Sequence, residues 1–133
     1  MTQQELKNYR KAEIDLKRIE DCMAELRHKI ESPNSVFYSD MPKSRGKHRD
    51  TSDHILKLHR LFDIYNRQWD ALIEERIRIE TAIAALPDPI ERTIVKYRYI
   101  DGHSWEKICV KIGYQWTQTH HIHAKALRDL SNL

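Results

Sequence analysis

Glycine and proline are scarce in this sequence, with 3 and 4 copies among 133 residues. Both residue types interrupt helices and dominate turns, and a sheet-rich fold needs many turns. Their scarcity, together with a 32% share of charged residues, favours an all-α protein and argues against a sheet. At this length we expect one domain or a small pair, with a core of modest size.

Cysteines and long apolar runs are scarce as well. Cys22 and Cys109 both fall on apolar faces of predicted helices, which indicates buried, reduced thiols. The longest apolar run, 82–86, is far too short to span a membrane. The first residues are polar and do not resemble a signal peptide. We therefore expect a soluble protein of the cytoplasm that does not act at a membrane.

The sequence also lacks the usual motifs of enzymes and metal sites. It has no nucleophile motif, no phosphate-cradling glycine loop and no clearly paired catalytic carboxylates. Among the eight histidines, His120 and His123 lie three apart on a predicted helix. No Cys-x-x-Cys or His-Glu-x-x-His spacing accompanies them. We predict no enzymatic activity, no metal and no other cofactor.

Two long stretches carry apolar residues at alternating steps of three and four, the spacing of a coiled coil. Thr2 and Glu5 form a capping box that opens the first helix, which runs to about Ile30, and Tyr9 and Ala12 extend its seam backward. Residues 50–53 offer N-caps for the second helix. The seam residues predicted to mediate oligomerisation are Leu16, Ile19, Met23, Leu26, Phe62, Tyr65, Trp69, Leu72, Arg76 and Ile79.

Residues 1–86 therefore predict a coiled-coil hairpin that serves as an oligomerisation region. A hairpin alone leaves much of both seams in water, so we expect a homodimer or a higher homo-oligomer. Arg76, the one charge in the second seam, either pairs with a carboxylate across the bundle or snorkels. Residues 31–50 lack helical spacing and are either a solvated linker or an arm that touches phosphates. The basic residues of that arm are Lys43, Arg45, Lys47 and Arg49.

Residues 87–133 contain three short helix signals joined by two tight turns, which is the spacing of a helix-turn-helix. Asp88 caps the first helix, Pro89 takes its first position and Glu91 closes a capping box. Gly102 ends this helix. Its predicted apolar face contains Ile90, Ile94, Val95 and either Tyr97 or Arg98.

Ser104 caps the second short helix, and Gly113 ends it, so that a third helix can cross the second at a steep angle. Cys109 is small enough to let the two backbones approach. Thr119 and Ile122 should point inward. The surface left facing outward near the start of the third helix would enter the major groove of DNA. Its residues are Trp116, Thr117, Gln118, His120 and His121.

Four strings in this region carry a family resemblance: 97–102, 104–108, 113–114 and 123–127. They resemble the C-terminal DNA-binding region of bacterial sigma factors and, more closely, phage transcriptional regulators of the RinA-like and ArpU-like kind. The resemblance covers roughly the last third of the chain. It implies a regulator, in the bacterial host cytoplasm, that activates late phage genes. Two features depart from the family: Gln115 replaces a capping Ser, and arginines are missing from the recognition helix.

We therefore predict that the chain binds double-stranded DNA, which a net charge of +3 permits without demanding. Gln118 can pair with adenine and Thr117 can touch a thymine methyl group, whereas Trp116 either enters the groove or shields Tyr114. The predicted phosphate contacts are Lys107, Lys111, Lys125 and Arg128. Three alternatives stay open: a packing unit without a DNA role, a module that binds RNA polymerase or another host factor, and a small DNA-packaging subunit.

Overall fold

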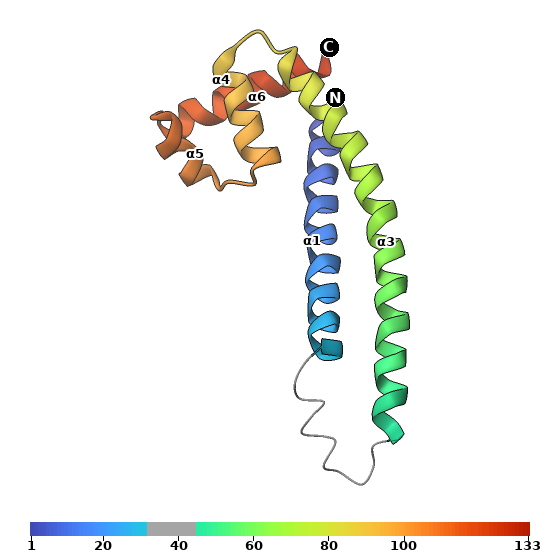
Figure 1. Ribbon diagram of the computed structural model, residues 1–133. Coiled ribbons are helices and arrows are strands. Elements are labelled where there is room, and N and C mark those ends of the chain that lie inside the picture. The colour runs from blue at the N-terminus through green and yellow to red at the C-terminus, as the bar shows by residue number, and fades with distance from the viewer. Residues whose placement is uncertain (32–44) are drawn as a thin grey trace. The chain divides into compact units, whose positions relative to one another are not determined.

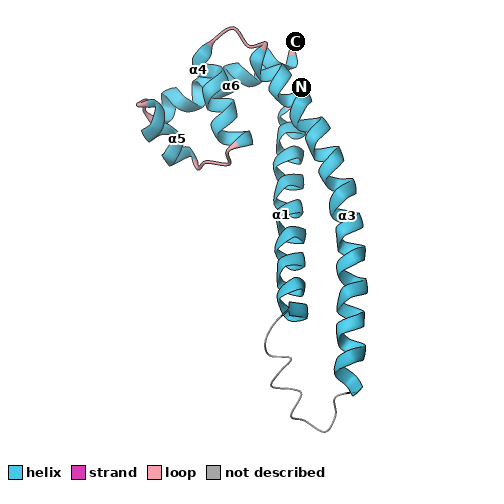
Figure 2. Cartoon of the chain, in the orientation of Figure 1, coloured by secondary structure: helices cyan, strands magenta, loops and turns pink. Residues whose placement is uncertain are grey.

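The computed structural model describes residues 1–31 and 45–133, and the side chains of residues 1–31 and 52–133. Figure 1 shows the elements: α1 (Gln3–Glu31), α3 (Arg45–Ala84), α4 (Pro89–Val95), η1 (Lys96–Ile100), α5 (Trp105–Ile112) and α6 (Trp116–Ser131). Every regular element in these residues is helical, and no strand occurs among them (Figure 2). The all-α class predicted from composition is confirmed.

The chain forms two compact units, and each long helix contributes to both. The terminal unit contains Met1–Glu13 and Leu72–Leu133, and the middle unit contains Ile14–Ala71. The boundary predicted at residue 86 therefore falls inside the terminal unit. The reason is that the N-terminal residues contact the C-terminal helices: the Met1 ammonium donates to the Leu130 carbonyl at 3.5 Å, and Gln3 Nε2 donates to the Tyr99 hydroxyl at 3.3 Å.

The termini of the long helices follow from local residues. The Thr2 N–H donates to Glu5 Oε2 at 2.6 Å and the Glu5 N–H donates to Thr2 Oγ1 at 3.3 Å, which confirms the capping box. The Thr2 N–H, followed by Arg78, lowers the pKa of Glu5 to about 2. The predicted start of the second helix at 50–53 is wrong, because α3 begins at Arg45. No proline lies between Arg45 and the predicted N-caps at 50–53, so the helix can begin upstream of them.

The buried seam of α1 differs by one position from the predicted one. Leu6, absent from the predicted seam, is fully buried and Tyr9 is 2% exposed, whereas Ala12 is exposed. Glu13 takes the heptad position between Tyr9 and Leu16. Ala12 was assigned to the seam because it is apolar. Steps of three and four from Leu6 instead place Glu13 in the seam. Cys22 is exposed, so the predicted burial of its thiol is wrong.

Arg76 pairs differently from the prediction. Its Nε donates to Glu80 Oε1, one turn along the same helix, at 3.2 Å. Across the helix pair its Nη1 donates to the Tyr9 hydroxyl at 3.4 Å. The carboxylate partner is therefore on its own helix, and the partner on α1 is a phenol. A neighbour at i+4 is within reach of a guanidinium in any helix, which makes this pairing the easier one.

In the middle unit the α3 seam is only partly covered. Ile55, Phe62 and Trp69 lie seven residues apart on one side of α3 and are 41%, 49% and 43% exposed. Leu16 and Met23 of α1 are buried in this unit. Other apolar residues at heptad spacing in this unit are half-buried: Ile19, Leu26 and Ile30 of α1, and Leu58 and Tyr65 of α3. In the terminal unit, by contrast, Leu72, Ile79 and Ile83 of α3 are all buried, as is Leu86 just beyond its end.

α4 continues directly into η1, and the side chains of η1 point in other directions than those of a regular α-helix. The Ile90 N–H donates to Asp88 Oδ1 at 3.0 Å and Pro89 takes the first helical position, as predicted. η1 then closes a wider turn, with the Asp101 N–H donating to the Lys96 carbonyl at 3.0 Å. This π-type turn shifts the side-chain register. Ile94 and Val95 of the predicted face are buried, but η1 buries Tyr99 and Ile100 and leaves Tyr97 and Arg98 half-buried.

Candidate nucleic-acid interface

The turn from α5 to α6 is built by local residues. Ser104 Oγ accepts the Lys107 N–H at 3.2 Å and so caps α5. Gly113 has a φ of 75°, and its N–H donates to the Cys109 carbonyl at 2.9 Å. A Cβ at this position would meet no atom within 4 Å. Glycine is therefore needed for the backbone conformation and not for space.

The crossing of α5 and α6 is held by small and apolar side chains. The Cys109 thiol donates to Thr119 Oγ1 at 3.4 Å, and the Thr119 hydroxyl donates to the Gln115 carbonyl at 2.9 Å. Ile108 and Thr119 are fully buried, and Ile122 is half-buried. The inward face predicted for the two helices is thus the face that is buried.

The opposite side of the first turns of α6 is open. Trp116 is 51% exposed, and Thr117, Gln118 and His121 are exposed. Gln115 precedes the helix without a side-chain capping bond, and no acidic residue lies in the first turn. The N-terminal N–H groups of α6 therefore present partial positive charge without a carboxylate to offset it. We call the side chains of Trp116, Thr117, Gln118 and His121 the outer face of α6.

His120 is half-buried and lies beside the outer face of α6. Its ring lies between two indoles, with centroid distances of 4.3 Å to Trp105 and 4.4 Å to Trp116. Its Nε2 is buried and has no hydrogen-bond partner among the described residues. His120 was predicted to read bases, but a half-buried ring in this position supports Trp116 instead. Trp116 packs on His120 on one side and stays half exposed.

A buried polar chain continues from these rings. The Tyr99 hydroxyl lies 2.8 Å from His123 Nε2 and accepts a bond from Gln3 Nε2 at 3.3 Å. The rings of Trp105 and His123 meet edge to face at 4.6 Å. Burial, followed by the charges of His120, Arg98 and Lys7, lowers the pKa of His123 to about 4. His123 is therefore neutral near pH 7 and accepts the Tyr99 proton in its hydrogen bond.

Sequence reasoning missed Tyr99 and His123 as a connected pair. The three-residue step from His120 to His123 was visible, and it does place both rings on one side of α6. The partner was hidden, because a regular helix would have pointed Tyr97 or Arg98 inward. The π-type turn of η1 moves Tyr99 into that place.

The predicted phosphate contacts differ in their availability. Lys107, Lys111 and Arg128 are exposed, and Lys111 Nζ lies 5.4 Å from the centroid of Tyr97. Lys125 Nζ instead lies 2.9 Å from Glu91 Oε1 and 3.8 Å from Asp129 Oδ2. The predicted phosphate role of Lys125 therefore competes with an ion pair inside the chain. The side chains of Lys43, Arg45, Lys47 and Arg49 lie outside the described residues.

Glu91 explains why Lys125 is engaged. Glu91 was predicted to close a capping box, but its side chain is fully buried, and Oε2 finds no hydrogen-bond partner in the described part of the chain. Burial raises the pKa of Glu91, and the nearby Asp129 carboxylate acts in the same direction. The Lys125 ammonium opposes both effects. The predicted reciprocal cap is wrong because Glu91 turns toward α6.

We expect Lys125→Met to destabilise the fold more at high pH than at low pH. Losing the ammonium raises the folded-state pKa of Glu91 further above its ordinary value of 4.5. A raised acid pKa lowers stability as pH climbs through and above that value. Thermal unfolding should show a Tm lower by about 5–10 °C at pH 8 and a clearly smaller change at pH 5.

Two further variants serve as controls for the Lys125→Met prediction. Lys107→Met removes an exposed ammonium of α5 and should leave the Tm unchanged at both pH values. Glu91→Gln combined with Lys125→Met removes the buried charge and should restore most of the Tm at pH 8. An equal loss at pH 5 and pH 8 would contradict a charge effect and point to lost packing by the Lys125 stem.

No group of three or more His, Cys, Asp or Glu side chains is arranged to hold a metal ion in residues 1–31 and 45–133. None of the described helices has the length and apolarity to cross a membrane. No protein-family model, curated protein or solved structure matches the chain.

Proposed function

We propose that this chain is a sequence-specific DNA-binding regulator, in which α5 and α6 act as a sigma-like helix-turn-helix. The observation that carries this proposal is the division of α6 into two faces. Thr119 and Ala126 are buried against the rest of the terminal unit, while Trp116, Gln118 and His121 project outward. A helix that begins after a glycine turn and keeps its first turns free is the element that enters a major groove.

The outer face has the chemistry for base readout. Gln118 can donate to and accept from adenine, and Thr117 can contact the methyl group of thymine. His121 adds a donor or an acceptor according to its tautomer. The open N-terminus of α6 suits a backbone phosphate, and Lys107, Lys111 and Arg128 supply exposed cations. Resemblance to the RinA-like and ArpU-like regulators suggests phage or prophage promoters as targets and activation of late genes as the outcome.

The middle unit favours an oligomer built on a coiled-coil hairpin. Ile55, Phe62 and Trp69 repeat every seven residues and remain exposed, although isolated soluble chains seldom expose such a stripe. A second copy of the chain would cover it in a bundle. A two-fold dimer would also match two half-sites on DNA. Light scattering of the full chain should give twice the monomer mass, whereas a ring would give a larger multiple and favour a packaging subunit.

A protein-binding module is the second candidate function. Val110 is 82% exposed and Trp116 is 51% exposed, and arginine is missing from the first turns of α6. Apolar and aromatic side chains on a helical surface are typical of protein contacts. Under this alternative the chain would occupy RNA polymerase or another host factor without reading DNA.

Binding to a random-sequence duplex at two salt concentrations separates the two functions. Fluorescence anisotropy should show binding at low salt that weakens as salt rises, because phosphate contacts release counterions. Arg128→Gln should reduce the salt slope by about one, and Lys11→Gln, a matched loss of charge on an exposed position of α1, should not. Absence of binding at low salt would remove the DNA function and favour the protein-binding module.

Gln118→Ala should relax sequence preference at one base pair. The lost bidentate pair is worth about 1–3 kcal/mol of discrimination against the wrong base. Competition between the preferred duplex and a single-base variant, after selection from a random pool, measures this effect. Affinity for random duplex should stay unchanged, since the amide touches bases and not phosphates. An equal loss on both duplexes would show that Gln118 does not read sequence.

A further inference from the structure

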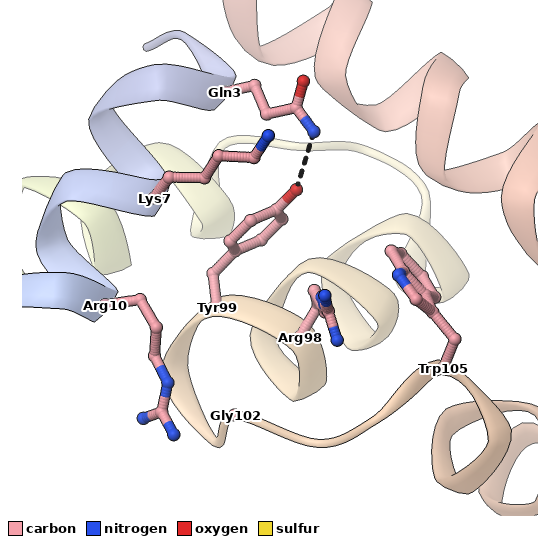
Figure 3. A pocket seen from close by; sticks show the side chains of 7 residues that line it. All are labelled: Gln3, Lys7, Arg10, Arg98, Tyr99, Gly102 and Trp105. Atoms are coloured by element: carbon pink, nitrogen blue, oxygen red, sulfur yellow. Dashed lines mark hydrogen bonds between the residues drawn. The ribbon is translucent and has the colours of Figure 1, made fainter. Parts of the chain in front are cut away.

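A pocket of about 340 Å³ lies in the terminal unit, apart from the outer face of α6. Its walls come from the first turns of α1, from η1 and from the loop that leads to α5 (Figure 3). Lys7, Arg10 and Arg98 provide three cations around it. No carboxylate lines it, although the chain carries 20 acidic residues. We propose that this pocket binds a phosphate group.

The cations of the pocket are only weakly compensated within the chain. In the part that the structure describes, neither Lys7 nor Arg98 forms an ion pair with a carboxylate. Arg98 Nη1 donates to the His103 carbonyl at 3.1 Å, which leaves its other N–H groups available. Arg10 pairs with Glu13 at 3.4 Å, and both side chains are about one-third exposed. Glu13 lies against Nη1 of Arg10, which leaves the other N–H groups of this guanidinium available to an anion.

The loop backbone makes room for this arrangement. Gly102 has a φ of 71°, and a Cβ built there would overlap the guanidinium of Arg10. Glycine therefore does two things at this position: it accepts the left-handed backbone and it lets Arg10 lie against the loop. Figure 3 shows Arg10 extending beside Gly102, with Arg98 and Lys7 on other sides of the hollow. Two of the three cations, Lys7 and Arg10, thus come from α1, and Arg98 comes from η1.

The chemistry of the walls favours a compact anion over a planar aromatic one. Arg98 covers the Trp105 ring at 4.8 Å, and the rings of His120 and His123 pack on the same indole at 4.3 Å and 4.6 Å. The indole is therefore not free to stack a base. The Tyr99 hydroxyl is held by Gln3 and His123. A tetrahedral oxyanion can accept hydrogen bonds from ammonium and guanidinium groups, which are the charged donors that this pocket supplies.

The same phosphate chemistry has two sources: a small phosphate compound or the backbone of bound DNA. The first is tested by titrating the full chain with inorganic phosphate against chloride at equal ionic strength. The indole N–H resonance of Trp105 and the ring resonances of His123 report on occupancy. Lys7 and Arg98 contribute to the low pKa of His123, so an anion beside them should raise it. The second source is tested by the salt dependence of binding to a random duplex.

Lys7→Gln is the test variant and Lys11→Gln is its control. Both lysines are exposed on α1, so neither change should unfold the chain, and both remove one charge. Loss of a charge-assisted contact should weaken phosphate binding by about tenfold in Lys7→Gln alone. If the source is DNA, Lys7→Gln should instead lower the salt slope by about 0.9, with Lys11→Gln unchanged. A loss specific to Lys7→Gln in either titration supports the site. Equal behaviour of the two variants in both titrations overturns it.

Discussion

Replacing Ile108 by alanine is expected to lower the free energy of unfolding by about 2–5 kcal/mol, the range for removing a buried aliphatic side chain. Ile108 is fully buried on the inner face of α5, where α5 crosses α6. Ile94 of α4 and Leu130 of α6 are also fully buried in this unit. Close-packed interiors relax only partly around a deleted side chain, so the cavity left by Ile108→Ala should persist. Denaturant unfolding followed by far-UV circular dichroism measures the change.

Val110 supplies the matched control for this prediction. It lies two residues further along α5 and is 82% exposed. Val110→Ala should change the free energy of unfolding by no more than about 0.5 kcal/mol, as expected at an open surface position. If Val110→Ala cost as much as Ile108→Ala, the face of α5 turned toward α6 would be the opposite one.

The second large effect is a loss of stability on acidification that depends on His123. Its pKa falls from an ordinary value of 6.5 to about 4 in the folded chain. A base with a lowered folded-state pKa stabilises the fold fully above pH 6.5, and this contribution is lost as pH falls toward 4. The expected loss is about 3 kcal/mol between pH 7 and pH 4, because one pKa unit corresponds to about 1.4 kcal/mol.

His123→Gln isolates this contribution. The Gln amide can reach the Tyr99 hydroxyl as His123 Nε2 does, and it does not titrate. Unfolding free energies of the two proteins should therefore agree above pH 6.5 and separate by about 3 kcal/mol toward pH 4, where only the protein with His123 loses this contribution. Other acidic groups, such as Glu5, affect both proteins equally and cancel in the difference. A difference that stays constant from pH 7 to pH 4 would show that His123 is not buried in its neutral form.

Local signals in the sequence predicted much of the fold. Ser104, Asp88 and Gly113 mark helix ends through hydrogen bonds and backbone conformations that involve only neighbouring residues. The all-α class follows from composition for the same reason. The residues of η1 that turn inward were harder to predict. The wider turn at η1 moves Tyr99 inward, and its cause is not a residue type that sequence reading recognises.

The candidate interface was predicted in outline and corrected in detail. Spacing from Gly113 was enough to place Gln118 and His121 on the outside, because helical geometry fixes these directions. His120 and Lys125 were also assigned to DNA, but their roles depend on tertiary partners. The ring of His120 packs on Trp105, and the Lys125 ammonium pairs with Glu91, which lies 34 residues earlier. Such pairings arise only after the helices pack.

The cationic pocket was beyond the reach of the sequence. Lys7 and Arg98 are 91 positions apart and belong to stretches that were predicted to form separate domains. The first turns of α1 join the C-terminal helices instead, and Gln3 and Tyr99 are hydrogen-bonded there at 3.3 Å. A hydrophilic surface lysine carries no signal of such a partner.

The central claim is that the outer face of α6 lies against duplex DNA, and amide chemical shifts of the full chain mixed with its selected duplex test it most directly. We predict that the largest changes fall on residues 116–121, with smaller ones near Lys107 and Arg128. Changes confined to α1 and α3, or none at all when the duplex is saturating, would contradict it.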